Sequence, residues 1–120
     1  MSEYPETHGN TTVSPEVLVT IARLAALSVP GVSGLAPVPG GVNRLFRRGL
    51  TEGVHIETNE NVATVDLYLV VKNEVNIRDI SRNVQQQVAR ALQEMVGMDV
   101  GSVNIHIEDM DFGVDEVQST

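Results

Sequence analysis

The chain contains no cysteine and no tryptophan, and both absences limit the functions open to it. Without cysteine, a disulfide framework, a Cys-ligated zinc site and thiol catalysis are excluded, and the composition fits a reducing compartment. Aromatic residues make up 3% of the 120 residues, so the side chains on which RNA-binding modules stack bases are scarce. The composition indicates neither a thiol-based enzyme nor a base-stacking module.

Long apolar runs are also missing. Residues 1–10 are polar and acidic, without the basic and apolar regions of a secretory signal. No stretch approaches the roughly 18 apolar residues that a membrane-spanning helix requires. The sequence therefore predicts a cytoplasmic protein without a direct membrane span.

Positive charge is scarce as well. Eight Lys and Arg residues stand against 16 Asp and Glu residues, the formal net charge is -8, and Lys72 is the only lysine. A charge of this sign repels nucleic acid and anionic lipid unless a local basic patch reverses it. We therefore expect no nucleic-acid partner.

The length of 120 residues is typical of one domain, which is large enough to bury a core without disulfides or metals. We expect a flexible tail at residues 1–10, a single domain at 11–108 and an acidic flexible tail at 109–120. Two prolines and a glycine pair interrupt the domain and predict a long loop at 36–52. Loops of this length inside a compact domain are usually functional or mobile.

A first helix is predicted between Ser14 and Pro30. Ser14 is a favourable N-cap, Pro15 suits the first helical position, and Pro30 with the following glycine ends the pattern. Helical spacing predicts one apolar face. Its members are Val17, Leu18, Ile21, Leu24, Ala25 and Leu27.

A hairpin is predicted next, with strands at 53–58 and 61–72 around a turn at Thr58–Asn61. Alternation in the second strand separates two faces. The residues predicted to meet the helices are Ala63, Val65, Leu67, Leu69 and Val71; those predicted to face the other way are Val62, Thr64, Asp66, Tyr68 and Val70.

A second helix should start after Asn76, a favourable N-cap, and stop at Gly97. Its predicted apolar stripe comprises Ile77, Ile80, Val84, Val88, Ala91 or Leu92, and Met95. A last strand follows at 99–109, with Val103, Ile105 and Ile107 pointing inward. The fold class is therefore α+β, with two helices on one face of a small mixed sheet in the order helix-strand-strand-helix-strand. Residues 10–13 allow an extra N-terminal strand.

Three motifs resemble the bacterial alkaline-shock-protein family, also called the general-stress or envelope stress response family. They are Val-Pro-Gly-Val at 29–32, Val-Asn-Ile at 75–77 and Val-Asn-Ile-His-Ile at 103–107, within a similarity over about residues 11–112. The resemblance implies abundant, non-enzymatic cytoplasmic proteins linked to envelope homeostasis, some held at the membrane by a membrane-anchored partner. Glu74 replaces a usual glycine, and the usual glycine-rich middle segment differs here, so any role of that loop does not carry over.

Two His-x-Glu pairs are candidate metal ligands. His55 and Glu57 share one face of a strand, as do His106 and Glu108. If the two strands are neighbours, the four side chains could converge on zinc or another transition metal. The alternative is the ordinary solvated face of an open sheet, because polar residues alternate there in any case.

A partner-binding surface is predicted on the open face of the sheet. Tyr68 and Val70 lie on a face that the helices leave uncovered, and partly apolar open faces often meet a partner. Asn104 and His106 extend this face on the last strand and resemble a family feature. Scattered apolar surface residues that bind nothing are the alternative.

The loop segment 43–50 is a second candidate for binding. Arg44, Arg47 and Arg48 surround Phe46, so the segment could touch an acidic partner or an anionic membrane, at about 1 kcal/mol for each basic residue. A mobile loop with a partly docked Phe46 is the alternative.

Enzyme motifs are lacking: the chain has no P-loop, no G-x-S-x-G elbow and no H-E-x-x-H. Gly31–Gly34 matches the G-x-x-G clamp of KH domains by its letters, but it has no basic residue and favours a turn. We therefore expect a non-enzymatic, cofactor-free interaction module that self-associates or docks on a membrane-anchored or enzyme partner. The alternatives are a metal-binding protein or metal-dependent enzyme, and an RNA-binding module.

Overall fold

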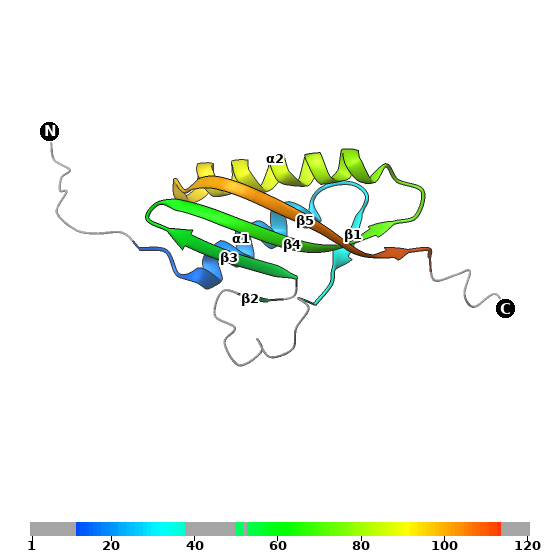
Figure 1. Ribbon diagram of the computed structural model, residues 1–120, viewed down its shortest axis with the longest axis horizontal. Coiled ribbons are helices and arrows are strands. Elements are labelled where there is room, and N and C mark those ends of the chain that lie inside the picture. Colours follow the sequence, from blue (N-terminus) through cyan, green and yellow to red (C-terminus); the bar gives the residue numbers. More distant parts are fainter. Residues whose placement is uncertain (1–11, 38–49, 52, 114–120) are drawn as a thin grey trace, which may run out of the picture.

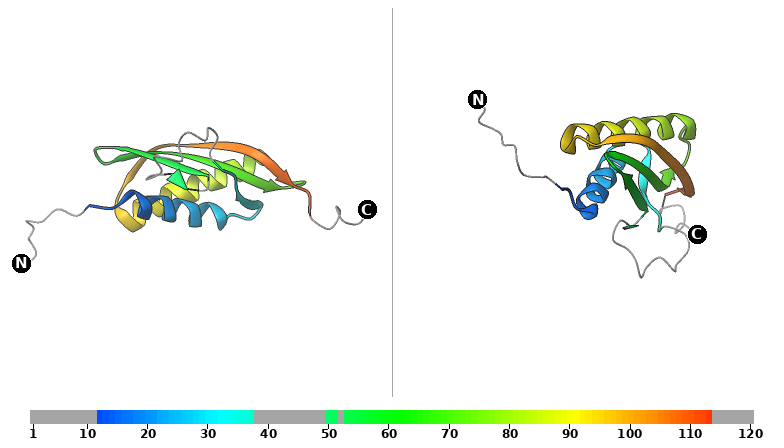
Figure 2. Two further views of the ribbon diagram at one scale, coloured as in Figure 1. Left: turned by 90° about the horizontal axis from the view of Figure 1, so that it is seen from below. Right: turned by 60° about the vertical axis from the view of Figure 1, so that its left-hand side comes forward.

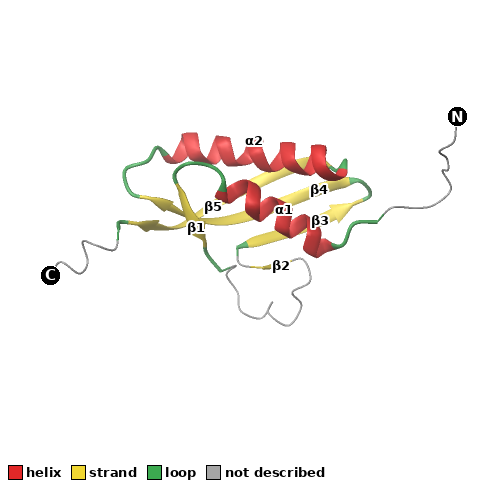
Figure 3. Cartoon of the chain, turned by 180° about the vertical axis from the view of Figure 1, so that it is seen from behind, coloured by secondary structure: helices red, strands yellow, loops and turns green. Residues whose placement is uncertain are grey.

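Two helices pack against one face of a five-stranded sheet and leave the other face open (Figures 1 and 3). The structure is a computed structural model that describes residues 12–37, 50–51 and 53–113. The elements are α1 (Pro15–Leu27), β1 (Val32–Leu35), β2 (Leu50–Thr51), β3 (Val54–Asn59), β4 (Val62–Lys72), α2 (Ile77–Val96) and β5 (Asp99–Asp111). The predicted α+β class with a mixed sheet is confirmed.

The strand β4 organises the sheet. β5 runs parallel along one edge of β4 from Asp99 to Asp111, and β3 and β1 pair antiparallel with successive parts of β4. At the junction of β3 and β1, Gly53 has a φ of 90°, and a Cβ there would lie 2.5 Å from the carbonyl oxygen of Ala36. Only glycine fits this close approach without strain.

Two strands lie where the sequence predicted none. Residues 28–31 form a turn after α1, and β1 starts at Val32, so only Gly31 of the turn expected at Gly31–Gly34 lies in a turn. The strand β2 pairs with β3. The described residues 12 and 13 belong to no strand. β5 continues to Asp111, three residues past the expected end of the domain.

The predicted helix caps are confirmed. The Ser14 side chain accepts a hydrogen bond from the Val17 N–H at 3.4 Å, and the Asn76 side chain accepts one from the Asp79 N–H at 3.0 Å. Gly97 ends α2 with a φ of 70° in the left-handed region. Both helices therefore begin at their predicted caps, and α2 ends at its predicted cap, whereas α1 already ends at Leu27, three residues before Pro30.

The core lies between the helices and the inner face of β4. All five predicted inner residues of β4 are fully buried, and α2 meets them with Ile80, Val84, Val88 and Leu92. Ile77 and Met95, at the two ends of the predicted α2 stripe, are exposed. On β5, Val103 is buried, and Ile105 and Ile107 pack half-buried against the core.

The predicted apolar face of α1 is wrong by roughly a third of a turn, at about 100° per residue. The residues that α1 buries are Leu18, Val19, Ala22 and Ala26, whereas Leu24 is 57% exposed and Val17 is 44% exposed. Apolar residues lie on nearly all sides of α1 itself, so helical periodicity did not define a single apolar face. The prediction therefore chose the side with the larger apolar residues. In the fold, the small alanines form part of the buried face, and Leu24 remains outside.

Candidate interaction surface on the open sheet face

Polar and aromatic side chains from three strands form a continuous row on the open face. Asp66 of β4 pairs in register with His55 of β3 on one side and with Asn104 of β5 on the other. One step further along the sheet, Tyr68 is opposite His106. The outward face predicted for β4 is thereby confirmed, and Asp66 lies at its centre.

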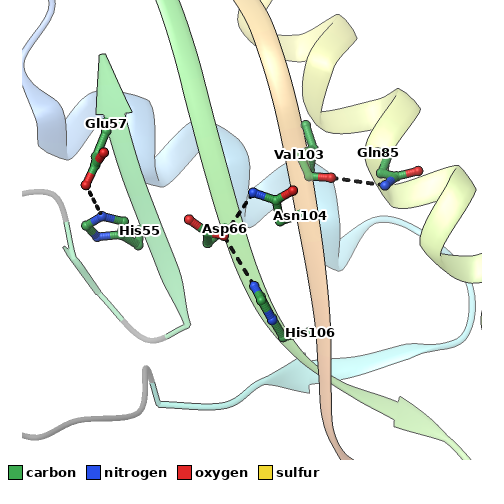
Figure 4. Close-up of polar contacts among 7 residues, drawn as sticks. All are labelled: His55, Glu57, Asp66, Gln85, Val103, Asn104 and His106. Atoms are coloured by element: carbon green, nitrogen blue, oxygen red, sulfur yellow. Dashed lines mark hydrogen bonds and ion pairs between the residues drawn. The ribbon is translucent and has the colours of Figure 1, made fainter. Parts of the chain in front are cut away.

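Asp66 organises this surface. The Asn104 Nδ2 donates to Asp66 Oδ1 at 3.1 Å, and the His106 Nε2 lies 3.2 Å from the same oxygen (Figure 4). Because an ionised carboxylate only accepts hydrogen bonds, the His106 contact is N–H donation from the ring. The two contacts fix the orientation of the amide and of the imidazole on neighbouring positions of β5.

Tyr68 and His106 form a stacked pair. Their ring centroids are 4.4 Å apart, and the ring planes differ by 10°. Partial burial raises the pKa of the Tyr68 hydroxyl, and the negative charges of Asp66 and Glu108 raise it further. The phenol therefore stays neutral at physiological pH and presents a hydroxyl that donates and accepts hydrogen bonds beside a flat aromatic surface.

The two His-x-Glu pairs do not converge. β4 lies between β3, which carries His55 and Glu57, and β5, which carries His106 and Glu108. His55 Nε2 contacts the neighbouring Glu57 carboxylate, at 3.0 Å, while His106 Nε2 contacts Asp66. No three His, Asp or Glu side chains of the described residues are grouped as metal ligands would be. The alternative of a four-residue metal set required β3 and β5 to be neighbours, and that condition is not met.

Register shifts in β5 change where its acidic residues point. Leu69 pairs with Ile107 and Val70 with Asp109, so Glu108 is the extra residue of a bulge. Val70 is half-buried between Gly34 of β1 and Asp109. Past the bulge, Val70 therefore lies opposite Asp109, while the Glu108 carboxylate remains close enough to Tyr68 for its charge to raise the pKa of the tyrosine.

A second polar contact ties β1 to the end of β5. The Ser33 hydroxyl donates to Asp111 Oδ2 at 2.6 Å, and the Gly113 N–H donates to Asp111 Oδ1 at 3.0 Å. These hydrogen bonds, with a smaller contribution from Lys72, lower the pKa of the Asp111 carboxyl. Sequence reasoning missed this contact, because it placed no strand at Ser33 and ended the last strand before Asp111.

Sequence reasoning also missed Asp66. Its position on the open face was predicted, but its role was not. A lone carboxylate in the apolar run Val65 to Val71 was the available signal, because an acidic residue in the middle of a strand is unfavourable unless its neighbours use it.

Other predicted binding residues cannot be placed on this surface. Arg44, Phe46, Arg47 and Arg48 lie outside the described residues. Gly31 is the last residue of the turn after α1, and residues 32–34 belong to β1, whereas a KH clamp joins two helices, so the RNA-binding alternative loses its motif. In the described part of the chain, no helix is both long and apolar enough to cross a membrane.

Comparison with known proteins supplies a family and a fold. The sequence profile of the alkaline shock protein 23 family, described by a cell envelope-related function, matches residues 3–112. YqhY of Bacillus subtilis (strain 168) is 30% identical over 113 residues, which are 92% of this chain and 84% of YqhY. The protein Spy1535 of Streptococcus pyogenes serotype M6 is 31% identical over 101 residues, 83% of this chain and 78% of that protein; both relatives carry the description "uncharacterized".

Among solved structures, the zinc form of a MamM CTD variant superposes with a TM-score of 0.52. The match covers 82% of this chain and 89% of that one at 15% sequence identity. The copper form of MamM CTD gives a TM-score of 0.51 at 16% identity, over 82% and 89% of the two chains. At such identities, the likeness concerns the fold.

Proposed function

The chain belongs to the alkaline shock protein 23 family, whose described function is related to the cell envelope, and from this premise we propose that it is a non-enzymatic interaction module. It binds a protein partner through the open face of its sheet and serves envelope homeostasis under stress. We place it in the cytoplasm, docked on a membrane-anchored protein or on an enzyme.

The observation that carries this proposal is the stacked pair of Tyr68 and His106 on an uncovered face. Asp66, which also accepts a hydrogen bond from Asn104, holds the His106 ring in one orientation before any partner arrives. Pre-orientation lowers the entropy that binding must overcome, and tyrosine is among the residues most enriched at the energetic centres of interfaces. Val70 adds apolar area beside the pair.

The basic segment 44–48 supports the choice of partner. Three arginines lie within five residues of the sequence here, although the chain as a whole has a formal net charge of -8. This local cluster of positive charge could steer an acidic partner toward the protein. Electrostatic steering of this kind acts mainly on the association rate and weakens with salt. A partner with an acidic surface fits the charge of this segment.

The experiment compares wild-type protein with the double variant Tyr68→Ala and His106→Ala as bait in lysate from which membranes have not been removed. The proposal expects one or more stoichiometric partners to be retained by the wild type and lost by the double variant. The matched control is His55→Ala with Glu57→Ala, which removes a polar pair from the same face without touching the stacked rings. Equal recovery of the partners by all three proteins, each with an unchanged circular dichroism spectrum, would refute this surface.

A further inference from the structure

The outward side of α1 carries an apolar stripe that is exposed in the structure. We define the α1 seam as Val17, Thr20, Leu24 and Leu27. Leu24 is 57% exposed, Val17 44% and Leu27 39%, and none of the four carries a charge. Three large apolar residues aligned on one helix face differ from apolar residues scattered singly, which are normal on protein surfaces.

The spacing of the α1 seam is that of a helix-pairing surface. Its members follow one another at intervals of three, four and three residues, the alternation of the two core positions in a heptad. The α1 seam has one flank on each side of it. The flank with Ile21 and Ala25 already packs against the core of the same chain. A second helix can therefore reach α1 only along the seam and along its other flank.

That other flank carries Glu16 and Arg23, seven residues apart and on the same line of the helix. In an antiparallel pair of identical helices, the same flank of each helix meets that of its partner with the direction reversed. Glu16 of one copy then lies against Arg23 of the other, and the two-fold symmetry forms this contact twice. A parallel pair would instead place both charges against the apolar flank.

We propose that the α1 seam is the docking surface for a second copy of this chain, through antiparallel α1–α1 pairing about a two-fold axis near Thr20. The midpoint between Glu16 and Arg23 falls next to Thr20, so Leu24 of each copy covers Val17 of the other. This inference deepens the proposed interaction module by naming one partner. It concerns a surface on the helix side, away from the sheet face assigned above (Figure 2).

The small size of the α1 seam limits the expected affinity of the dimer. A helix of 13 residues is about 20 Å long, so one helix pair buries less than the roughly 800 Å² per partner of a standard interface. The charge of -8 on each copy adds repulsion. The dimer should therefore dissociate with a constant that is roughly micromolar or weaker, and it must be sought at high protein concentration.

Sedimentation equilibrium of the untagged full chain over a wide concentration range is the first test. A monomer–dimer equilibrium is expected, and Leu24→Lys should weaken it by roughly tenfold or more because a charge is buried in the seam. The control is Gln86→Lys, which adds the same charge at an exposed position of α2. A wild-type chain that stays monomeric throughout, or a dimer that Leu24→Lys leaves unchanged, would overturn the proposal.

A charge exchange tests the antiparallel arrangement. Glu16→Arg and Arg23→Glu should each place like charges together across the pair and weaken the dimer by roughly fivefold or more. The double variant restores both contacts with the signs exchanged, and its dimer should return to near the wild-type strength. If both single variants weaken the dimer and the double variant dimerises equally weakly, this pairing is excluded.

The lack of cysteine in the chain allows a direct geometric test. Thr20→Cys places one thiol of each copy beside the two-fold axis, where the Cα atoms come within the roughly 7 Å that a disulfide can span. Mild oxidation should join most of the protein into a covalent dimer, whereas the control Gln87→Cys on α2 should not. Equal cross-linking of the two variants would contradict the proposal.

The same measurements separate this inference from the proposed function. Tyr68→Ala with His106→Ala should lose the captured partner and keep the dimer, while Leu24→Lys should lose the dimer and keep the sheet face intact. If the sheet-face variant abolishes self-association and Leu24→Lys does not, the second copy docks on the sheet and the α1 seam is excluded.

Discussion

The two faces of β4 differ in burial and in chemistry, although they alternate along one strand. The inner residues, among them Leu67 and Leu69, have no exposed surface at all, whereas the outer residues are half-buried at most. The inner face consists of apolar side chains that fill the core. The outer face is arranged around directional contacts of Asp66 and the stacked ring of Tyr68. One strand thus holds the fold together with one face and presents a specific surface with the other.

We expect the stability of this fold and the proposed recognition by its open face to be separable. Because successive side chains of a strand point to opposite faces, a change on one face leaves the other in place. The inner face should respond to lost volume with a lower free energy of unfolding. The outer face should respond to lost polar groups with little change in stability and a large change in binding.

The largest expected effect tests the inner face. Leu67→Ala removes a fully buried side chain from the centre of the core and should lower the free energy of unfolding by about 2–5 kcal/mol. The matched variant on the outer face is Val70→Ala, which should cost less than about 1 kcal/mol because Val70 is half-buried. Chemical denaturation monitored by circular dichroism measures both values. Similar losses of stability in the two variants would show that the two faces of β4 contribute equally to the free energy of unfolding.

A smaller effect tests the outer face. Asp66→Ala removes the acceptor shared by Asn104 and His106, and water can replace it because the side chains of Asp66 and His106 are 25% and 40% exposed. The free energy of unfolding should fall by only about 0.5–1.5 kcal/mol. The chemical shifts of the His106 ring protons, which lie over Tyr68, should nevertheless move as the stacked geometry loosens. The control is Glu57→Ala, whose carboxylate contacts His55 on β3. Unmoved His106 shifts in Asp66→Ala would show that stacking needs no support from Asp66.

Local signals predicted most of this fold. The alternation in β4 identified every residue of its two faces, and Ser14, Asn76 and Gly97 marked helix ends, because these signals depend on neighbours in the chain. The buried face of α1 was not predictable in this way. Its apolar residues surround the helix, and the choice between Leu24 and the alanines is made by the sheet beneath.

The candidate site was predicted in its residues but not in its pairing. Tyr68, Asn104 and His106 were placed on the open face from alternation alone. Strand order decides whether His106 meets His55 or Asp66, and no short-range pattern specifies that β5 joins β4 on the edge opposite β3. The bulge at Glu108 and the contact between Ser33 and Asp111 also depend on register, so they emerged only with the sheet assembled.

The smallest expected effect lies where the outer face ends, at the Asp111 carboxyl. The Ser33 hydroxyl is the largest cause of its lowered pKa, followed by the Gly113 N–H, and Lys72 contributes least. A carboxyl whose pKa is lower in the folded chain favours folding above its unfolded pKa, and this contribution is lost as the pH falls through the folded value. Ser33→Ala should therefore raise the pKa of Asp111 toward its ordinary value and flatten the acid dependence of stability in that window. Carbon-13 titration of the carboxyl measures the shift, with Ser102→Ala, an exposed serine on β5, as control. An unchanged Asp111 titration in Ser33→Ala would assign the lowered pKa to the backbone N–H and Lys72 instead, and the hydroxyl would then serve only to align β1 with the end of β5.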